Sequence, residues 1–329
     1  QQKPNDESGG VLKNQEKPPE NNTAQQQLGI SLISNKFVFE VTQSYLHSSS
    51  NQLFIDGFGL IPILVVGNVS VERIRRDTFV STMALRYKIS RNAQAEVRVP
   101  YQYTITRQST PTGITGNSSV SPSKDAMGYS GGFGDVSVGL NYSLMNEGLN
   151  HPALLGGLNF KGRNGRDVFT TPDAAMHPPP GSGFFSVGGS LTASKTTAPA
   201  IVYGSIGYNH AFPRNNVVLY RANGPPVLVN FEPGDSFNLS AGMTISLNYS
   251  FALNFSYSQS VSLSSYLNGR QLGNSAADAI MMRIGATWRL GVKSSIDVGT
   301  TFGLTPDAPN FRLDVRVPWN IGAQEHHDD

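Results

Sequence analysis

In Phe237-Asn-Leu-Ser-Ala-Gly-Met-Thr-Ile-Ser-Leu247, large apolar residues alternate with small or polar residues. The same alternation runs through Phe251-Ala-Leu-Asn-Phe-Ser-Tyr257, and only Asn248-Tyr-Ser250 separates the two stretches. Successive side chains of a β-strand point to opposite faces, so a period of two predicts strands with one apolar and one polar face. The short separation predicts that the two strands form an antiparallel hairpin.

The length and polar face of these strands favour a membrane barrel over a soluble sandwich. Strands of soluble sheets average about five or six residues, and their wet face is rich in Lys and Glu. Here the alternation persists over about 10–14 residues, as barrel strands of about 9–11 residues or more require, and the polar face is mainly Ser, Asn, Thr and Gly. A soluble all-β fold is the alternative that this pattern disfavours.

Twelve such strands are predicted. They span residues 36–47, 77–89, 93–105, 132–145, 152–162, 183–194, 199–211, 235–248, 251–263, 278–290, 294–303 and 310–320. Short connections alternate with connections that are mostly long and rich in Gly, Pro, Ser and Asn. This alternation is typical of an all-β, antiparallel transmembrane barrel in a Gram-negative outer membrane, with periplasmic turns and extracellular loops. The connection Phe58–Val71 is unusually apolar, and we interpret it as an early start of the second strand rather than as a loop folded inward.

Composition argues against several other classes of protein. The chain of 329 residues has no Cys, which excludes disulfides and thiolate metal sites, and its net charge of +2 gives no reason to expect nucleic-acid binding. The longest apolar run, Leu60–Val66, is too short for a membrane helix. No His/Glu spacing suits zinc, and His210 has no obvious Ser partner, so we expect no enzyme activity, no metal and no cofactor. The chain opens without an apolar leader, which we interpret as a mature or truncated form.

Three regions are predicted: residues 1–35, a periplasmic linker or plug; residues 36–320, the barrel; and residues 321–329, a polar tail. The first region is polar, but a short helix over 10–17 is compatible with the sequence before Pro18-Pro19. About 35 extended residues span over 100 Å, so the segment that joins this helix to the barrel is long enough for the helix to fold back into the lumen. The predicted plug residues are Val11, Leu12, Lys13, Glu16 and Lys17. A disordered linker is the alternative.

Strand parity assigns most strand charges to the lumen, because a charge that faces lipid costs several kcal/mol near the midplane. The predicted lumen-wall residues are Glu40, Arg86, Glu96, Arg98, Arg283, Arg289, Asp297, Arg312, Asp314 and Arg316. Pairing of the last strand with the first would bring Arg312, Asp314 and Arg316 near Glu40. These charges would pair to stiffen the wall, provide a field that selects solutes or holds a plug, or do both.

The outward face is expected to carry aromatic girdles at the two headgroup layers. The candidates are Tyr45, Tyr87, Tyr101, Tyr103, Tyr142, Tyr249, Trp288 and Trp319.

Several motifs resemble a known family. Gly134-Asp-Val-Ser-Val-Gly-Leu140, Pro152-Ala-Leu-Leu-Gly-Gly-Leu158, the run Gly181–Phe212 and Leu304-Thr-Pro-Asp-Ala-Pro-Asn-Phe311 resemble outer-membrane proteins assigned to the meta-pathway of phenol degradation. With its polar N-terminal extension and twelve strands, the chain is most similar to the functional-amyloid secretion porins of the Fap system. That resemblance implies a channel for unfolded amyloid subunits, a homotrimer formed through an upstream coiled coil, and occlusion by an N-terminal helix.

The residues of the predicted wall bear on three possible functions. A sparsely charged wall of Ser, Asn, Thr and Gly favours a secretion channel in which an unfolded chain slides without sticking. An importer or diffusion channel for small aromatic or apolar molecules is the alternative, and it needs apolar residues that face the lumen, for which Met281 is the candidate in its strand. A hydrolase lacks a recognisable triad. The expected partner is outer-membrane lipid, with no nucleic acid.

Overall fold

The computed structural model describes residues 32–33, 36–49, 52–55, 58–62, 73–109, 125–220, 225–291 and 294–321. Thirteen strands in these ranges form one antiparallel sheet. Within the same ranges, no helix is long and apolar enough to cross a membrane.

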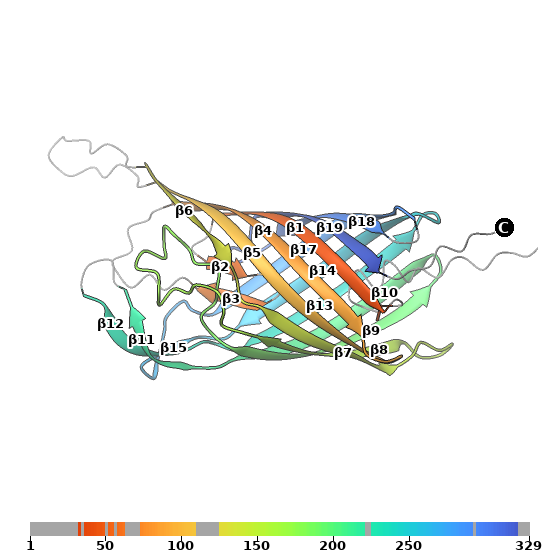
Figure 1. Cartoon of the computed structure of the whole chain (residues 1–329), viewed down its shortest axis with the longest axis horizontal. Coiled ribbons are helices and arrows are strands. Elements are labelled where there is room, and N and C mark those ends of the chain that lie inside the picture. The colour runs from red at the N-terminus through yellow and green to blue at the C-terminus, as the bar shows by residue number, and fades with distance from the viewer. Residues whose placement is uncertain are drawn as a thin grey trace, which may run out of the picture.

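Twelve of the thirteen strands close into a barrel, because β4 pairs with both β1 and β5 (Figure 1). The strands are β1 (Phe37–Ser48), β4 (Arg73–Lys88), β5 (Ala93–Ser109), β7 (Ser137–Met145), β8 (Ala153–Lys161), β9 (Ser186–Thr197), β10 (Ala200–Ala211), β13 (Ser236–Ser246), β14 (Phe251–Ser262), β17 (Ala277–Arg289), β18 (Ser295–Gly303) and β19 (Phe311–Ile321). The last strand pairs with the first, with Phe37 opposite Ile321. The predicted twelve-stranded barrel is confirmed.

The two ends of the barrel differ. Short connections such as Ser90-Arg-Asn92 lie at the end where β1 begins and β19 ends; we call it the turn end, and it is the periplasmic end of such barrels. The other end, the loop end, carries a four-stranded sheet made of β11 (Arg214–Leu219), β12 (Val227–Glu232), β15 (Tyr266–Leu267) and β16 (Arg270–Gln271). Figure 1 shows β11, β12 and β15 at the left, beyond most barrel strands.

The interpretation of Phe58–Val71 as an early start of the second strand is wrong for its first residues. β2 (Gln52–Ile55) and β3 (Phe58–Pro62) form a separate hairpin, and β3 approaches β14 and β17, several strands away around the barrel. β4 begins only at Arg73, because its register ends with Ser48 opposite Arg76 on β1 and with Ser109 opposite Arg73 on β5. Beyond that point no described strand offers pairing partners. Residues 63–72 lie outside the described residues.

One predicted strand, 132–145, is interrupted. Its first residues are the end of β6 (Asp125–Phe133) and its last residues are β7, and both of these strands pair with β5. Phe133 lies opposite Tyr101 and Ser137 opposite Arg98, so four steps on one strand match three on β5, which is the count of a β-bulge. β8 ends opposite the start of β9, with Lys161 opposite Ser186. The far edge of β6 therefore pairs with no strand in the described ranges, and residues 162–185, the inner segment, occupy this place.

The outward face is apolar and aromatic. Seven of the predicted girdle residues are exposed: Tyr87, Tyr101, Tyr103, Tyr142, Tyr249, Trp288 and Trp319. Near the turn end, the ring of Tyr87 lies 4.9 Å from that of Phe37. Near the loop end, Tyr45 lies 5.2 Å from Phe79. Two aromatic layers on an apolar wall match the interfaces of a bilayer.

Candidate functional site: a constricted lumen

A buried ladder of charges crosses four strands on the lumen side. Arg316 Nε on β19 lies 3.5 Å from Glu40 Oε1 on β1. Arg86 Nη2 on β4 lies 3.1 Å from Glu40 Oε2, and its Nε lies 3.3 Å from Glu96 Oε2 on β5. Arg98 also pairs with Glu96. Each carboxylate thus contacts two arginines, which compensates its removal from bulk water.

Two further clusters continue the charged wall on β17, β18 and β19. Arg283 pairs with Asp297, whose other oxygen accepts a hydrogen bond from Thr287 Oγ1 at 2.9 Å. Arg312 Nε donates to Asp314 Oδ1 at 2.7 Å, and Ser44 Oγ on β1 donates to the same oxygen at 2.5 Å. These groups occupy the same side of the barrel as the ladder.

The structure brings nine of the ten predicted lumen-wall residues into these three clusters. Arg289 lies apart: its Nε donates to the Gly291 carbonyl at 3.2 Å, and its guanidinium stacks over Tyr249 at 5.5 Å from the ring centroid. It therefore belongs to the rim of the turn end. The predicted plug residues, Val11, Leu12, Lys13, Glu16 and Lys17, lie outside the described residues.

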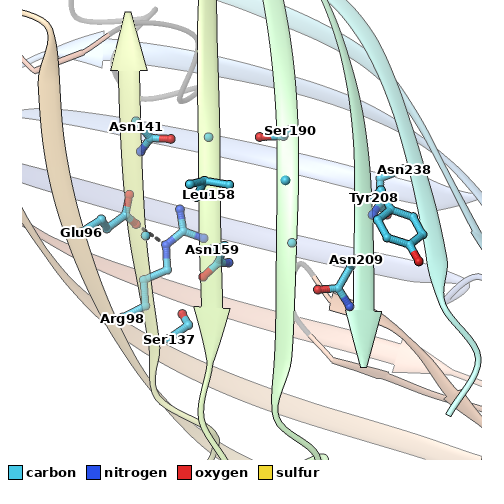
Figure 2. A pocket seen from close by; sticks show the side chains of 14 residues that line it. Glu96, Arg98, Ser137, Asn141, Leu158, Asn159, Ser190, Tyr208, Asn209 and Asn238 are labelled. Carbon is cyan, nitrogen blue, oxygen red and sulfur yellow. Dashed lines mark hydrogen bonds and ion pairs between the residues drawn. The ribbon is translucent and has the colours of Figure 1, made fainter. Parts of the chain in front are cut away.

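The opposite side of the lumen bears small polar residues. Figure 2 shows this wall, which lines a cavity of about 270 Å³. Its inward-facing residues from β7 to β13 are Ser137, Gly139, Asn141, Gly157, Asn159, Gly188, Ser190, Asn209 and Asn238. Glu96 and Arg98 close one side of the cavity. The free space of the lumen lies against this small-residue wall because the opposite wall is filled with long charged side chains.

Two amides in this wall have unused acceptors. Asn159 Oδ1 and Asn209 Oδ1 are buried and have no hydrogen-bond partner within the described part of the chain. A buried polar atom without a partner costs about 1–3 kcal/mol, so such atoms normally bind water or a ligand donor. Both side chains line the cavity, so a change of rotamer would turn these acceptors towards a solute.

The inner segment seals the interruption in the wall through one carboxylate. Asp135 Oδ1 accepts a hydrogen bond from Gly165 N at 3.0 Å, and Oδ2 accepts from Ser182 N at 2.7 Å and Ser182 Oγ at 2.6 Å. Lys161 Nζ donates to Ser182 Oγ at 2.7 Å and lies 4.0 Å from Asp135. All three side chains are buried. Side-chain hydrogen bonds thus replace the backbone ladder where the strand is broken.

Glycines allow the backbones at this seam to meet. A Cβ on Gly165 would lie 2.7 Å from Gly181 Cα and 3.0 Å from the Gly134 carbonyl carbon. Further along, the inner segment lies against the inward face of β6, where Ser130 Oγ donates to the Pro178 carbonyl at 2.5 Å. Arg76 Nη2 on β4 donates to the Ala175 carbonyl at 3.2 Å. The segment is therefore folded into the barrel.

Two cavities of about 40 Å³ each lie beyond the large one. Arg98 and Ser137 line both the large cavity and the first small one, and Lys161 lines both small ones. The first small cavity has an apolar side made by Leu46, Val80, Pro100 and Pro180. The second sets Phe184 and Phe231 against hydroxyl groups of Ser186, Ser236 and Ser262, and these hydroxyls have no partner within the described residues. Each is narrow and amphipathic.

An apolar cluster covers the lumen at the loop end. Its buried members are Phe169, Phe184, Val217, Leu219, Val229 and Phe231. Phe169 and Phe184 come from the inner segment and pack edge to face at 5.5 Å. Arg214 fixes this cluster from β11, because its Nη1 donates to Asp167 Oδ2 at 2.6 Å while its guanidinium lies over Phe169.

Ile33, which precedes β1 in the chain, packs inside the barrel. Ile33 is 1% exposed, and its backbone N–H donates to Gln94 Oε1 at 2.9 Å. Gln94 is a buried, inward-facing residue of β5 near the turn end. Ile33 therefore lies in the lumen.

Sequence reasoning missed the residues that narrow the lumen. The sequence analysis places Asp135 in a predicted strand and Ser182 just before another, and it gives neither residue a role in the lumen. The signal that could have identified the seam is the pair of Gly-rich stretches, around Gly134 and Gly181, on either side of a long Pro-rich connection. His210 lies on the outward face beside Asp235, with Nδ1 2.7 Å from Oδ1. No group of three or more potential metal-ligating side chains occurs in the residues described.

No family model matches the chain. Among solved structures it is similar to the COG4313 outer membrane channel from Pseudomonas putida F1, with 13% identity, a TM-score of 0.60, and coverage of 88% of this chain and 96% of that one. The transport unit of the autotransporter AIDA-I from Escherichia coli is 11% identical, with a TM-score of 0.45 and coverage of 92% of this chain and 98% of that one. A FadL homologue of Pseudomonas aeruginosa is 10% identical, with a TM-score of 0.39 and coverage of 87% of this chain and 90% of that one.

At these identities the likeness is one of fold. With its closed antiparallel barrel and aromatic layers, the chain is a β-barrel of the Gram-negative outer membrane.

Proposed function

We propose that this protein is a diffusion channel for small amphipathic molecules, such as aromatic compounds that carry a hydroxyl or carboxylate group. The observation that carries the proposal is the narrow lumen between the described residues, where a cavity of about 270 Å³ adjoins two of about 40 Å³ that the inner segment helps to line. A cavity of this size is close to the lower limit of ligand pockets, about 300 Å³. It accommodates one small solute and not a polypeptide chain.

The class of solute follows from the lining of the cavities. The two small cavities pair an apolar side with hydroxyl or charged groups. The large cavity is lined by the amides of Asn159 and Asn209, and Arg98 offers a cation whose side chain is 48% exposed. A flat solute with an apolar ring and a polar group matches this sequence of environments.

Filling the large cavity tests the proposal. Ser190 faces the lumen and is exposed to it, whereas the next residue, Leu191, faces outward. We expect S190W to lower the flux of 4-hydroxybenzoate into proteoliposomes at least several-fold, since the indole fills the cavity. L191W adds the same ring on the lipid face and should leave the flux unchanged. Equal flux in S190W and wild type would refute transport through this cavity.

Secretion of unfolded amyloid subunits, gated by an N-terminal plug, stays a prediction. Such a substrate needs displacement of the inner segment, which the seam at Asp135 opposes. The buried position of Ile33 supports the plug half of this hypothesis, because this residue near the end of the N-terminal region lies inside the barrel. Homotrimer formation and membership of the Fap or phenol-pathway proteins stay predictions as well.

A further inference from the structure

An unusual pair of arginines faces outward at the loop end. Arg75 on β4 lies directly opposite Arg107 on β5, and both are exposed. Like charges directly opposite each other on one face of a sheet destabilise the pairing. Within the described residues Arg75 makes no ion pair or hydrogen bond. Among the described residues, the pair therefore has one carboxylate partner, Asp77 beside Arg107, for two positive charges, and an anion would neutralise the remaining one.

Neighbouring groups hold one arginine of the pair in place. Asp77 Oδ2 accepts a hydrogen bond from Arg107 Nη1 at 2.9 Å. Its Oδ1 accepts from Tyr45 OH at 2.8 Å and lies 2.8 Å from His47 Nδ1. The single carboxylate of the patch is thus engaged on both oxygens and 12% exposed in its side chain, so it repels an approaching anion little. Two arginines and His47 remain on the surface.

The depth of the pair matches a lipid headgroup. Arg75 lies twelve residues from Tyr87, which belongs to the aromatic layer at the turn end. Twelve residues span about 40 Å along a strand, and about 30 Å along the membrane normal at a strand tilt of about 40°. The apolar band of such barrels is about 25 Å tall. The two guanidinium groups therefore lie just beyond the hydrocarbon of the outer leaflet.

An apolar surface lies directly below the arginines. Phe79 faces Tyr103 across β4 and β5, and Tyr129 follows on β6; these rings are 42%, 40% and 54% exposed. Met127, opposite Arg107, is 57% exposed. An amphiphile with acyl chains beside the rings and phosphate at the arginines would satisfy both halves of the patch, because guanidinium groups bind phosphate through paired hydrogen bonds.

We infer that the outward patch made by His47, Arg75, Asp77 and Arg107 is a binding site for the phosphorylated headgroup of lipid A, the lipid that forms the outer leaflet of this membrane. Arg75 and Arg107 bind the phosphate, Asp77 positions Arg107, and Phe79, Tyr103 and Tyr129 contact the acyl chains. The occupant neutralises the two opposed arginines and fixes β4 and β5 at the membrane surface.

The barrel contains its own comparison surface. Tyr208 and His210 on β10 meet Asp235 just before β13, in the same arrangement as Tyr45, His47 and Asp77. Four strands separate β1 and β4 from β10 and β13 on either side, so the two sites lie on opposite sides of the barrel. β9, β10, β13 and β14 contain no arginine. The second site should not bind phosphate.

Native mass spectrometry of the detergent-solubilised protein, titrated with diphosphoryl lipid A, tests the inference. We expect one tightly bound lipid A, and an affinity lower by about tenfold or more in R75Q/R107Q, since a hydrogen bond to a charged group contributes about 1.5–3 kcal/mol. R163Q/R270Q removes the same charge elsewhere on the exposed surface, and H210Q/D235N alters the second site; both should bind like wild type.

Heat-modifiable gel mobility shows whether each variant is folded, and R75K/R107K keeps the charge if the glutamine variant does not fold; it should bind more weakly than wild type because lysine lacks the planar fork. If R75Q/R107Q folds and binds lipid A as tightly as wild type, the inference is overturned. If R75Q/R107Q does not fold, the same result for R75K/R107K overturns it. The inference is also overturned by equal affinity of wild type for phosphatidylglycerol, which would make the patch a general anionic-lipid surface, or by displacement of lipid A by millimolar inorganic phosphate, which would make it a phosphate site.

Discussion

At the scale of single residues, Asp135 is the group on which the closure of the barrel wall depends. It accepts three hydrogen bonds and lies 4.0 Å from buried Lys161. D135A leaves that cation without its carboxylate, so we expect the free energy of unfolding to fall by about 3–5 kcal/mol. Urea titration in lipid vesicles measures it. Asp173 in the same segment is 60% exposed in its side chain, and D173A should unfold like wild type. An unchanged midpoint for D135A would contradict this role.

Arg312 and Arg316 determine the sign of the field along the charged wall. Their side chains are 16% and 27% exposed, and they face Asp314 and Glu40. R312E/R316E replaces two positive charges by two negative ones, so the reversal potential in a salt gradient should shift towards cation selectivity. R163E, on an exposed residue outside the lumen, serves as the control. If the double variant fails to insert while R163E inserts, the two side chains face lipid and our strand parity is off by one residue.

At the scale of elements, the inner segment limits the width of the pore. Replacing residues 168–179 by a short Gly/Ser linker removes Phe169 from the apolar cluster and Pro178 from the contact with β6. We expect single-channel conductance to rise about twofold or more, because the obstruction in the lumen is shortened. Removing Asn268 and Gly269, in the exposed β15–β16 turn, should have little effect. Equal conductance in the two deletions would place the constriction elsewhere.

The strands could be predicted from the sequence because the bilayer imposes the alternation on every strand. The alternation in Phe237–Leu247 predicted β13 to within a residue or two at each end. The same argument could not find the break between Phe133 and Ser137, because one extra residue in a Gly-rich stretch changes parity without changing composition. It also could not place β3, since an apolar connection fits a longer strand as well as an inward hairpin.

The candidate site was only partly predictable for the same reason. Charges such as Glu40 and Arg86 could be assigned to the lumen, because lipid excludes them. The cavity beside Asn159 and Asn209 depends on which side of the barrel carries small residues, and that is a property of the closed sheet rather than of any one strand. The position of the inner segment depends on contacts between residues far apart in the chain, such as Asp135 with Ser182.

At the scale of the whole molecule, the N-terminal region is expected to add to the obstruction. Ile33 lies buried in the lumen near the turn end, which gives a plug formed by this region an attachment point inside the barrel. Deleting residues 1–30 should raise single-channel conductance and admit larger solutes, provided that this region plugs the pore. A matched deletion of residues 323–329 serves as the control. Equal conductance with and without residues 1–30 would leave the region a tether.

The whole barrel is proposed to work as a narrow path for small molecules. Osmotic swelling of proteoliposomes in a series of solutes tests this most directly, because it measures the largest solute that the intact lumen admits. A cavity of about 270 Å³ predicts swelling with arabinose and 4-hydroxybenzoate, a steep loss between monosaccharides and trisaccharides, and no entry of an unfolded Gln/Asn-rich peptide. Free entry of that peptide through the wild-type protein would contradict the account.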